Sequence, residues 1–210
     1  MTDTAQSLHQ SDSKPDRKPD TIIVGGGLVG MTTALALAKF GIRSTVLDSA
    51  TLEDTATAEF DGRATAIASA SWRMFQVLGL ADRLADVACP INEIRVTEGL
   101  EPRHLHFDGR EFDGDPLGHM VENRHLRTAL IEAGHAEPLI DIHAPVTLGE
   151  IERDEYRASV ALADGDAVTA PLLIAADGRR SRLREDVGIR IADWRYDQEA
   201  VVGMISHERD

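Results

Sequence analysis

Hydrophobic and polar residues follow one another along the chain in blocks that predict an α/β fold. The β-branched run 21–24 is followed by glycine and predicts a buried strand. Residues 28–40 are rich in Ala and Leu and predict a helix that ends at Gly41. The apolar run 43–47 predicts a second strand. These segments make a β-α-β unit of about thirty residues, the size of a crossover between parallel strands.

The rest of the chain continues this succession of helices and strands. Helical composition that ends at a glycine predicts helices over residues 64–78 and 123–133. Alternating or continuously apolar runs predict strands over residues 91–96, in short pieces within 99–118 and 144–170, and over 172–176 and 194–206. An Asp-Gly pair at 164–165 predicts a hairpin turn.

The N-terminal part of the chain raises two further questions. Residues 1–20 are rich in Ser, Asp, Lys and Pro, which predicts a disordered tail, and they lack the apolar core of a secretory signal. Residues 21–38 contain no charge over eighteen positions, the lower limit of a membrane helix. The glycine cluster within them favours a strand–turn–helix instead.

The amino-acid composition argues against several kinds of binding partner and metal site. The formal net charge is −14 at pH 7, and a surplus of this sign repels nucleic acids and anionic lipids. The single cysteine, Cys89, excludes an internal disulfide and a multi-cysteine zinc site, and we expect it to be buried. Hydrophobic residues make up 42% of the chain, enough for a core. These features predict an acidic, cytoplasmic protein with no nucleic-acid partner.

A glycine-rich turn follows the first predicted strand. Residues 25–30 satisfy G-x-G-x-x-G, a helix follows, and Asp48 lies eighteen positions after the last glycine. Gly25 would make the tight turn, Gly27 would let a pyrophosphate approach, and Gly30 would allow close helix–strand packing. Asp48 would accept hydrogen bonds from a ribose, so the turn predicts a dinucleotide site. A structural turn without a ligand is the alternative, and the turn alone does not separate FAD from NAD.

A second strand–turn–helix spans residues 173–184. Its apolar strand delivers Asp177 to the carboxyl end, where open α/β sheets bind ligands. Gly178 permits close backbone approach, and the arginines that follow can offset phosphate charge. The alternative is a surface Asp-Gly turn capped by Ser181.

These motifs carry a family resemblance. The pattern D-G-x-x-S-x-x-R is met by Asp177, Gly178, Ser181 and Arg184. With the glycine turn before it, this order resembles the FAD-dependent aromatic-ring hydroxylases, the group A flavoprotein monooxygenases. Residues 61–63 resemble the D-x-R segment of that family, and residues 123–130 resemble its helix beside the flavin. The runs R-A-T-A-I-A-S-A-S, V-E-N-R-H-L and Y-D-Q-E-A-V-V are most similar to the ubiquinone-biosynthesis hydroxylases.

The resemblance implies a Rossmann-like, glutathione-reductase-type α/β FAD-binding domain with an inserted, incomplete β-rich substrate domain. The implied division after the tail is an FAD-binding domain over 21–90 and 119–190, and substrate-domain segments over 91–118 and 191–210.

The resemblance also assigns residues to the cofactor. Gly25, Gly27, Gly30 and Asp48 would take the ADP half of FAD. Arg63 and Arg124 would lie near the flavin or its pyrophosphate. Asp177 and Gly178 would sit where FAD and the incoming NAD(P)H are both accommodated.

The implied reaction belongs to the cofactor. NAD(P)H reduces FAD, and the reduced flavin uses O₂ to hydroxylate a phenolic ring, here a polyprenylated quinone precursor. We therefore name no catalytic side chain and no metal. A substrate of this kind also implies peripheral association with the inner membrane or with a biosynthetic complex.

Two other functions compete with this interpretation. The family's later motif G-D-A-x-H does not occur in the sequence, which predicts an N-terminal portion and favours a non-catalytic dinucleotide-binding fragment. An NAD-dependent oxidoreductase would use the same glycine turn, but it has no need of the D-G-x-x-S-x-x-R motif.

Two further groups are expected to be structural. His104 and His106 alternate along one strand, but no third ligand is spaced to complete a metal site, so we expect a solvated strand face. Trp194 and Tyr196 also share a strand face, for which we expect packing in the core rather than contact with an aromatic substrate.

Overall fold

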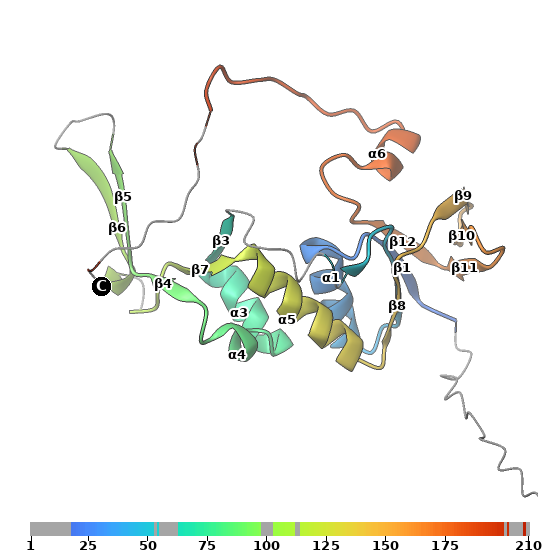
Figure 1. Cartoon of the computed structure of the whole chain (residues 1–210), viewed down its shortest axis with the longest axis horizontal. Helices are drawn as coiled ribbons and strands as arrows, with labels where there is room; N and C mark the ends of the chain where they lie inside the picture. The colour runs from blue at the N-terminus through green and yellow to red at the C-terminus, as the bar shows by residue number, and fades with distance from the viewer. Residues whose placement is uncertain are drawn as a thin grey trace, which may run out of the picture.

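A computed structural model describes residues 18–52, 54, 63–97, 103–111, 114–199, 201 and 208. Within these residues the chain has a mixed α/β fold with a parallel sheet, two antiparallel three-stranded sheets and a separate hairpin (Figure 1). The predicted tail lies outside them except for its last three residues.

The parallel sheet lies between helices on one face and an antiparallel sheet on the other. Its strand order is β12-β1-β2-β8, and every neighbouring pair is parallel. The bounds are Thr21–Val24 for β1, Ser44–Leu47 for β2, Ile140–His143 for β8 and Leu172–Ala175 for β12. The sequence prediction of β1, β2 and β12 is confirmed, but it missed β8, an edge strand with a polar residue at every second position.

Alternate residues of β1 enter two separate cores. Ile23 points into the cluster formed with the helices, whereas Ile22 and Val24 belong to the cluster on the opposite face. Ile22 and Ile23 are both fully buried, so both faces of the sheet are covered. This explains why β1 is continuously apolar in sequence.

Helix α1 (Leu28–Ala38) connects β1 to β2, and α5 (Asn123–Ala136) packs against it. The expected end of α5 before Gly134 is wrong, because the helix runs through that residue. A Cβ on Gly134 would lie 2.6 Å from Cε of Met31, so this glycine allows the two helices to approach. A glycine can mark a close contact as well as a helix end.

The other face of the parallel sheet is covered by a meander, in which β10 is the central strand. Its strands are β9 (Leu148–Arg153), β10 (Ala158–Leu162) and β11 (Ala167–Ala170). The hairpin turn predicted between the last two is confirmed, and Gly165 in it has a φ of +97°.

The helix predicted over 64–78 is only half correct. Residues Ala64–Ala68 form strand β3, which pairs antiparallel with β7 (Gly118–Glu122), and helix α3 covers Ser69–Leu78. Strand β4 (Cys89–Ile91) pairs with the other edge of β7. Alanine-rich sequence favours a helix locally, but the ladder to β7 outweighs that preference here.

Strands β5 (Glu93–Thr97) and β6 (His104–Asp108) form a hairpin that projects from the rest of the described chain (Figure 1). Its cross-strand pairs give it one polar face and one apolar face. The remaining short elements are α4 (Ala81–Leu84), the 3-10 turn η1 (Gly109–Glu111) and α6 (Arg182–Asp186).

Three sequence expectations about single residues and the C-terminal segment are wrong. Cys89 is exposed rather than buried. Trp194 and Tyr196 are 67% and 75% exposed, so they do not pack in the core. The described residues 194–199 form no strand, and most of the predicted strand beyond them lies outside the described residues.

No helix in the described segments has both the length and the apolar composition needed to cross a membrane.

The fold makes one pH-dependent prediction, at His119 of β7. Its ring stacks on Trp72 with centroids 3.9 Å apart, and its Nδ1 is buried without a hydrogen-bond partner among the described residues. Burial lowers the pKa of His119 from 6.5, so the unfolded chain binds more protons here than the folded one as pH falls below that value.

We expect the free energy of unfolding of the wild type to fall between pH 7.5 and 5.5 more steeply than that of His119→Phe, which keeps the ring stack. Urea denaturation at several pH values measures both slopes. Parallel slopes would contradict the prediction.

Candidate functional site

The glycine turn joins three elements at a spacing that no larger residue allows. Gly25 has a φ of +108°, and a Cβ on it would lie 2.3 Å from the carbonyl oxygen of Ala176, just after β12. A Cβ on Gly30 would lie 1.7 Å from the carbonyl oxygen of Gly25. The turn therefore requires glycine at both positions, as the sequence predicts.

Gly27 differs from these two glycines because it faces open space. It is the N-cap of α1 with an ordinary φ of −73°, and a Cβ on it would meet no atom within 4 Å. It has no side chain with which to cap the helix, so the first N–H groups of α1 are left for another acceptor. A helix end of this kind favours an anion such as a phosphate.

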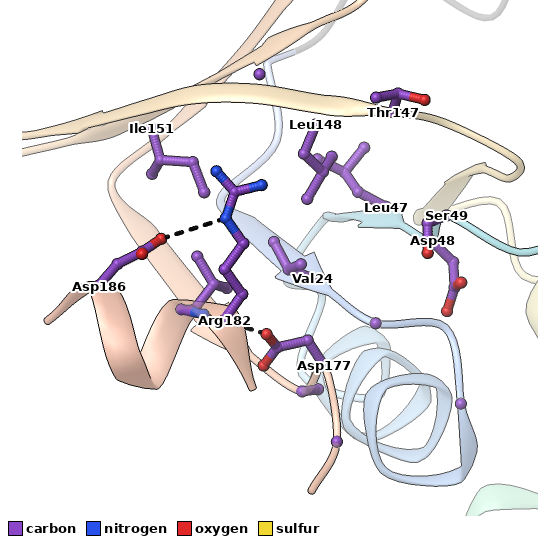
Figure 2. A pocket seen from close by; sticks show the side chains of 16 residues that line it. Val24, Leu47, Asp48, Ser49, Thr147, Leu148, Ile151, Asp177, Arg182 and Asp186 are labelled. Atoms are coloured by element: carbon purple, nitrogen blue, oxygen red, sulfur yellow. Dashed lines mark hydrogen bonds and ion pairs between the residues drawn. The ribbon is translucent and has the colours of Figure 1, made fainter. Parts of the chain in front are cut away.

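Two pockets open on either side of Gly27. The meander pocket, about 450 Å³, lies between the end of the parallel sheet, the start of β9 and α6 (Figure 2). The α5 pocket, about 560 Å³, lies between the glycine turn, the segment after β2 and α5. Gly27 and Asp48 line both, so together the pockets flank the helix end on two sides.

Asp48 ties the end of β2 to the glycine turn. Its Oδ2 accepts a 2.6 Å hydrogen bond from the backbone N–H of Gly26, and its Oδ1 accepts one of 2.8 Å from Ala50. Each carboxylate oxygen retains a further lone pair for a ligand. Asp48 thus supports the turn and also presents an acceptor to both pockets.

Asp177 lies across the meander pocket from Asp48 (Figure 2). Its Oδ2 accepts a 3.3 Å hydrogen bond from the backbone N–H of Leu183, whereas its Oδ1 is buried without a partner among the described residues. An unsatisfied buried acceptor costs about 1–3 kcal/mol, which a ligand hydroxyl could recover. Gly178 next to it has a φ of +87°, and Ser181 caps α6 as the surface-turn alternative expected, since its Oγ accepts from the N–H of Arg184.

The two predicted flavin-side arginines lie near each other but outside both pockets. Arg63 directly precedes β3, and its carbonyl oxygen accepts a 3.1 Å hydrogen bond from the N–H of Asn123 at the start of α5. Arg124 is the next residue, and its Nε donates a 2.6 Å hydrogen bond to Glu122. Asp61 and Gly62 of the same motif lie outside the described residues.

Sequence analysis missed Arg127, which lines the α5 pocket with Asp48 and Gly27. It follows Arg124 by three positions and so lies on a neighbouring part of the same helix surface. That spacing was the available signal. Arg127 supplies a positive charge to a pocket whose other charged lining residues are carboxylates.

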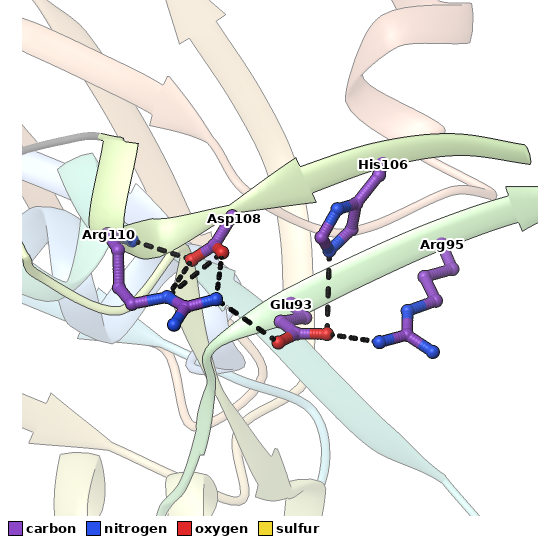
Figure 3. Close-up of polar contacts among 5 residues, drawn as sticks. All are labelled: Glu93, Arg95, His106, Asp108 and Arg110. Atoms are coloured by element: carbon purple, nitrogen blue, oxygen red, sulfur yellow. Dashed lines mark hydrogen bonds and ion pairs between the residues drawn. The ribbon is translucent and has the colours of Figure 1, made fainter.

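The polar face of the β5–β6 hairpin holds a group of metal-ligand type that sequence spacing did not reveal. Ligand atoms of Glu93, His106 and Asp108 lie within 4.8 Å of one another, because the strand register sets them side by side (Figure 3). Arg110 donates to both oxygens of Asp108 and lowers its pKa to about 2, and Arg95 bonds Glu93. A cation would have to displace these arginines, so the cluster is best explained as an ion-pair network.

Comparisons with known proteins bear on the glycine-turn site. Residues 18–208 match the family model of an FAD-binding domain. The chain belongs to this FAD-binding family. FAD is therefore the cofactor of this family, and this favours the FAD interpretation of the glycine turn over the NAD one.

The relatives are hydroxylases of the type that the resemblance indicated. The chain is 43% identical to "Ubiquinone hydroxylase UbiL" of Rhodospirillum rubrum, over 92% of this chain and 45% of the relative. It is 34% identical to the 3-demethoxyubiquinol 3-hydroxylase of Escherichia coli, over 90% of this chain and 48% of the relative. The chain thus spans about half the length of these curated relatives.

Solved structures share the mixed α/β fold of this chain. The p-nitrophenol 4-monooxygenase PnpA of Pseudomonas putida superposes with a TM-score of 0.66 at 24% identity, over 81% of this chain and 44% of that one. PqsL of Pseudomonas aeruginosa in complex with 2-aminobenzoylacetate gives a TM-score of 0.72 at 22% identity, over 86% of this chain and 48% of that one.

The residues of the site fit FAD. The open helix end at Gly27 suits a pyrophosphate, and the unpaired Oδ1 of Asp177 suits a hydroxyl donor. The carboxylates would repel a phosphate placed on them, so their place is beside hydroxyl or amine groups.

Substitutions at Gly27 test this arrangement. Gly27→Asp would cap α1 and leave its stability unchanged or slightly higher, because the new side chain enters open space. Its carboxylate would repel the pyrophosphate, so we expect FAD affinity to fall by about a hundredfold, roughly the cost of an unfavourable charge contact of 2–3 kcal/mol. Flavin fluorescence titration and thermal melts measure the two effects.

Gly27→Asn is the matched control, since it has the same shape and caps as well without the charge. We expect it to bind FAD more tightly than Gly27→Asp does. Equal affinities would show that bulk rather than charge governs the position.

Proposed function

We propose that this protein acts in an FAD-dependent monooxygenase that hydroxylates a phenolic ring of a ubiquinone precursor, with NAD(P)H as donor and O₂ as oxidant. The observation that carries the proposal is the meander pocket, in which the helix end at Gly27 and the unpaired carboxylate oxygen of Asp177 converge. The 43% identity to a protein named as a ubiquinone hydroxylase supports the choice of substrate class.

In this proposal the ADP half of FAD occupies the glycine-turn site. Gly25 and Gly30 hold the turn closed, and Gly27 leaves the N–H groups of α1 to the pyrophosphate. Asp48 accepts hydrogen bonds from the ribose. Its negative charge disfavours a 2′-phosphate at this position.

The remaining predicted residues serve the other end of the cofactor and the donor. Arg63 and Arg124 would lie near the flavin or its pyrophosphate, where their positive charge would offset negative charge on the cofactor. Asp177 and Gly178 line the region that both FAD and NAD(P)H approach. We assign no nucleophile and no general base to a side chain.

Bound FAD supplies the redox chemistry, taking a hydride from NAD(P)H and activating O₂. The protein's part is to bind, to orient and to exclude water. The proposed architecture is a Rossmann-like, glutathione-reductase-type domain over 21–90 and 119–190, with a β-rich substrate region over 91–118 and from 191 onward. The hairpin β5–β6 belongs to that substrate region.

The proposed substrate carries a polyprenyl chain and so resides in membranes. We therefore propose a cytoplasmic protein that contacts the inner membrane or a biosynthetic complex only at its surface. Small phenols without the prenyl tail would still reach the site, which makes them convenient probes.

A visible absorption spectrum tests the proposal directly. The purified chain is mixed with FAD, freed of excess cofactor, and titrated anaerobically with NADH or NADPH. We expect a bound-flavin band near that of free FAD, which bleaches on addition of the donor because hydride transfer reduces the ring. Uptake of O₂ with a phenol present then tests hydroxylation.

The outcomes separate the candidate functions. A chain that stays colourless contradicts the enzymatic proposal for these residues. A bound flavin that no donor reduces favours the non-catalytic FAD-binding fragment. Gly30→Ala, whose Cβ cannot fit the turn, is the negative control for binding.

A further inference from the structure

We propose that Asn123 and Thr65 form a positioning pair that fixes the two flavin-side arginines, Arg63 and Arg124, relative to each other. The inference rests on the proposed function, because it assumes that these arginines face the flavin end of FAD. It goes beyond that function by assigning a role to two uncharged residues that touch neither pocket.

Asn123 is held at two points by the strand across from it. Its backbone N–H donates a 3.1 Å hydrogen bond to the carbonyl oxygen of Arg63. Its side-chain Oδ1 accepts a 2.6 Å hydrogen bond from the hydroxyl of Thr65. The two contacts lie on either side of Ala64, so the first residue of α5 is hydrogen-bonded at two points to the start of β3.

The orientation of the Asn123 side chain is informative. Asn123 is the first residue of α5, whose N-cap is Glu122, so its side chain does not hold the capping position. Here its amide oxygen instead bonds a residue 58 positions away on another element. The side chain is 8% exposed, so this hydrogen bond is shielded from competing water.

These hydrogen bonds join the two segments that carry the charges. Arg63 directly precedes the strand bonded by Asn123, and Arg124 directly follows Asn123 in α5. The backbone bond from Asn123 to Arg63 and the side-chain bond from Thr65 therefore hold the two arginine positions close together. Glu122, on the other side of Asn123, bonds the Arg124 guanidinium and fixes its direction.

Pairing of the strands alone would not fix α5 in this way. Thr65 pairs with Val121 of β7, and that ladder ends at Glu122 opposite Ala64. The backbone bond from Asn123 to Arg63 continues this register by one residue, and the Thr65 hydroxyl bond is the contact that holds the Asn123 side chain to β3. Their loss would let the helix start shift relative to β3 without breaking the sheet.

Matched variants test the role. Thr65→Val keeps the shape of the side chain and removes the hydroxyl, whereas Thr65→Ser keeps the hydroxyl. Thr169→Val is the control, since it removes a comparable hydroxyl bond of 2.9 Å to Ser159 in the meander, away from the arginines. For each variant, the dissociation constant for FAD, the bound-flavin spectrum and the thermal midpoint are measured.

We expect Thr65→Val to weaken FAD binding by about tenfold and to shift the bound-flavin spectrum, as loss of a supporting hydrogen bond does at other sites. Thr65→Ser restores both. Thr169→Val lowers the thermal midpoint by a similar amount and leaves FAD affinity and spectrum unchanged.

Three outcomes overturn the inference. If Thr65→Val changes only the thermal midpoint, the pair is structural and does not position the arginines. If Thr65→Ser fails to restore affinity, the hydroxyl is not the group that matters. If the wild type binds no FAD, the inference and the proposed function are both wrong. The first two outcomes overturn the inference alone and leave the proposed function standing.

Discussion

The rest of the structure depends on the close backbone packing of β1, α1 and the end of β12 at the glycine turn. Gly25 and Gly30 leave no room for a Cβ, because carbonyl oxygens of Ala176 and of Gly25 itself occupy that space. The parallel sheet can bring Asp177 beside the start of α1 only at this spacing. The dinucleotide site is therefore a consequence of backbone packing, and the side chains around it refine what the backbone has made.

Backbone groups also determine where positive potential lies in this strongly acidic chain. A net charge of −14 would repel a cofactor with a pyrophosphate, and Asp48 and Asp177 both line the meander pocket. The helix end at Gly27 presents backbone N–H groups that suit a phosphate, and Arg127 adds a positive charge to the α5 pocket. The carboxylates suit hydroxyl groups, so one site offers partners to both phosphates and hydroxyls.

Local sequence patterns predicted those parts of the site that are formed by residues close together in the chain. The glycine turn, Asp48 and the Asp177 turn each lie at the end of a short apolar strand, where strand, turn and helix signals agree. Strand β3 was mistaken for helix because only its ladder to β7 makes it a strand. Arg127 and the Glu93 cluster escaped notice because their neighbours come from distant parts of the chain.

The same distinction separates the two ends of the cofactor. The residues proposed for the ADP end lie within one β-α-β unit and the strand that pairs with it, so they come together whenever the parallel sheet forms. In the proposed arrangement, the flavin end depends on a hydrogen bond between Thr65 and Asn123, which are 58 positions apart. A contact of that range exists only after β3, β7 and α5 have assembled. In the proposed arrangement the two halves of the cofactor are thus held by parts of the structure that assemble separately, so a substitution at one end can act without disturbing the fold of the other.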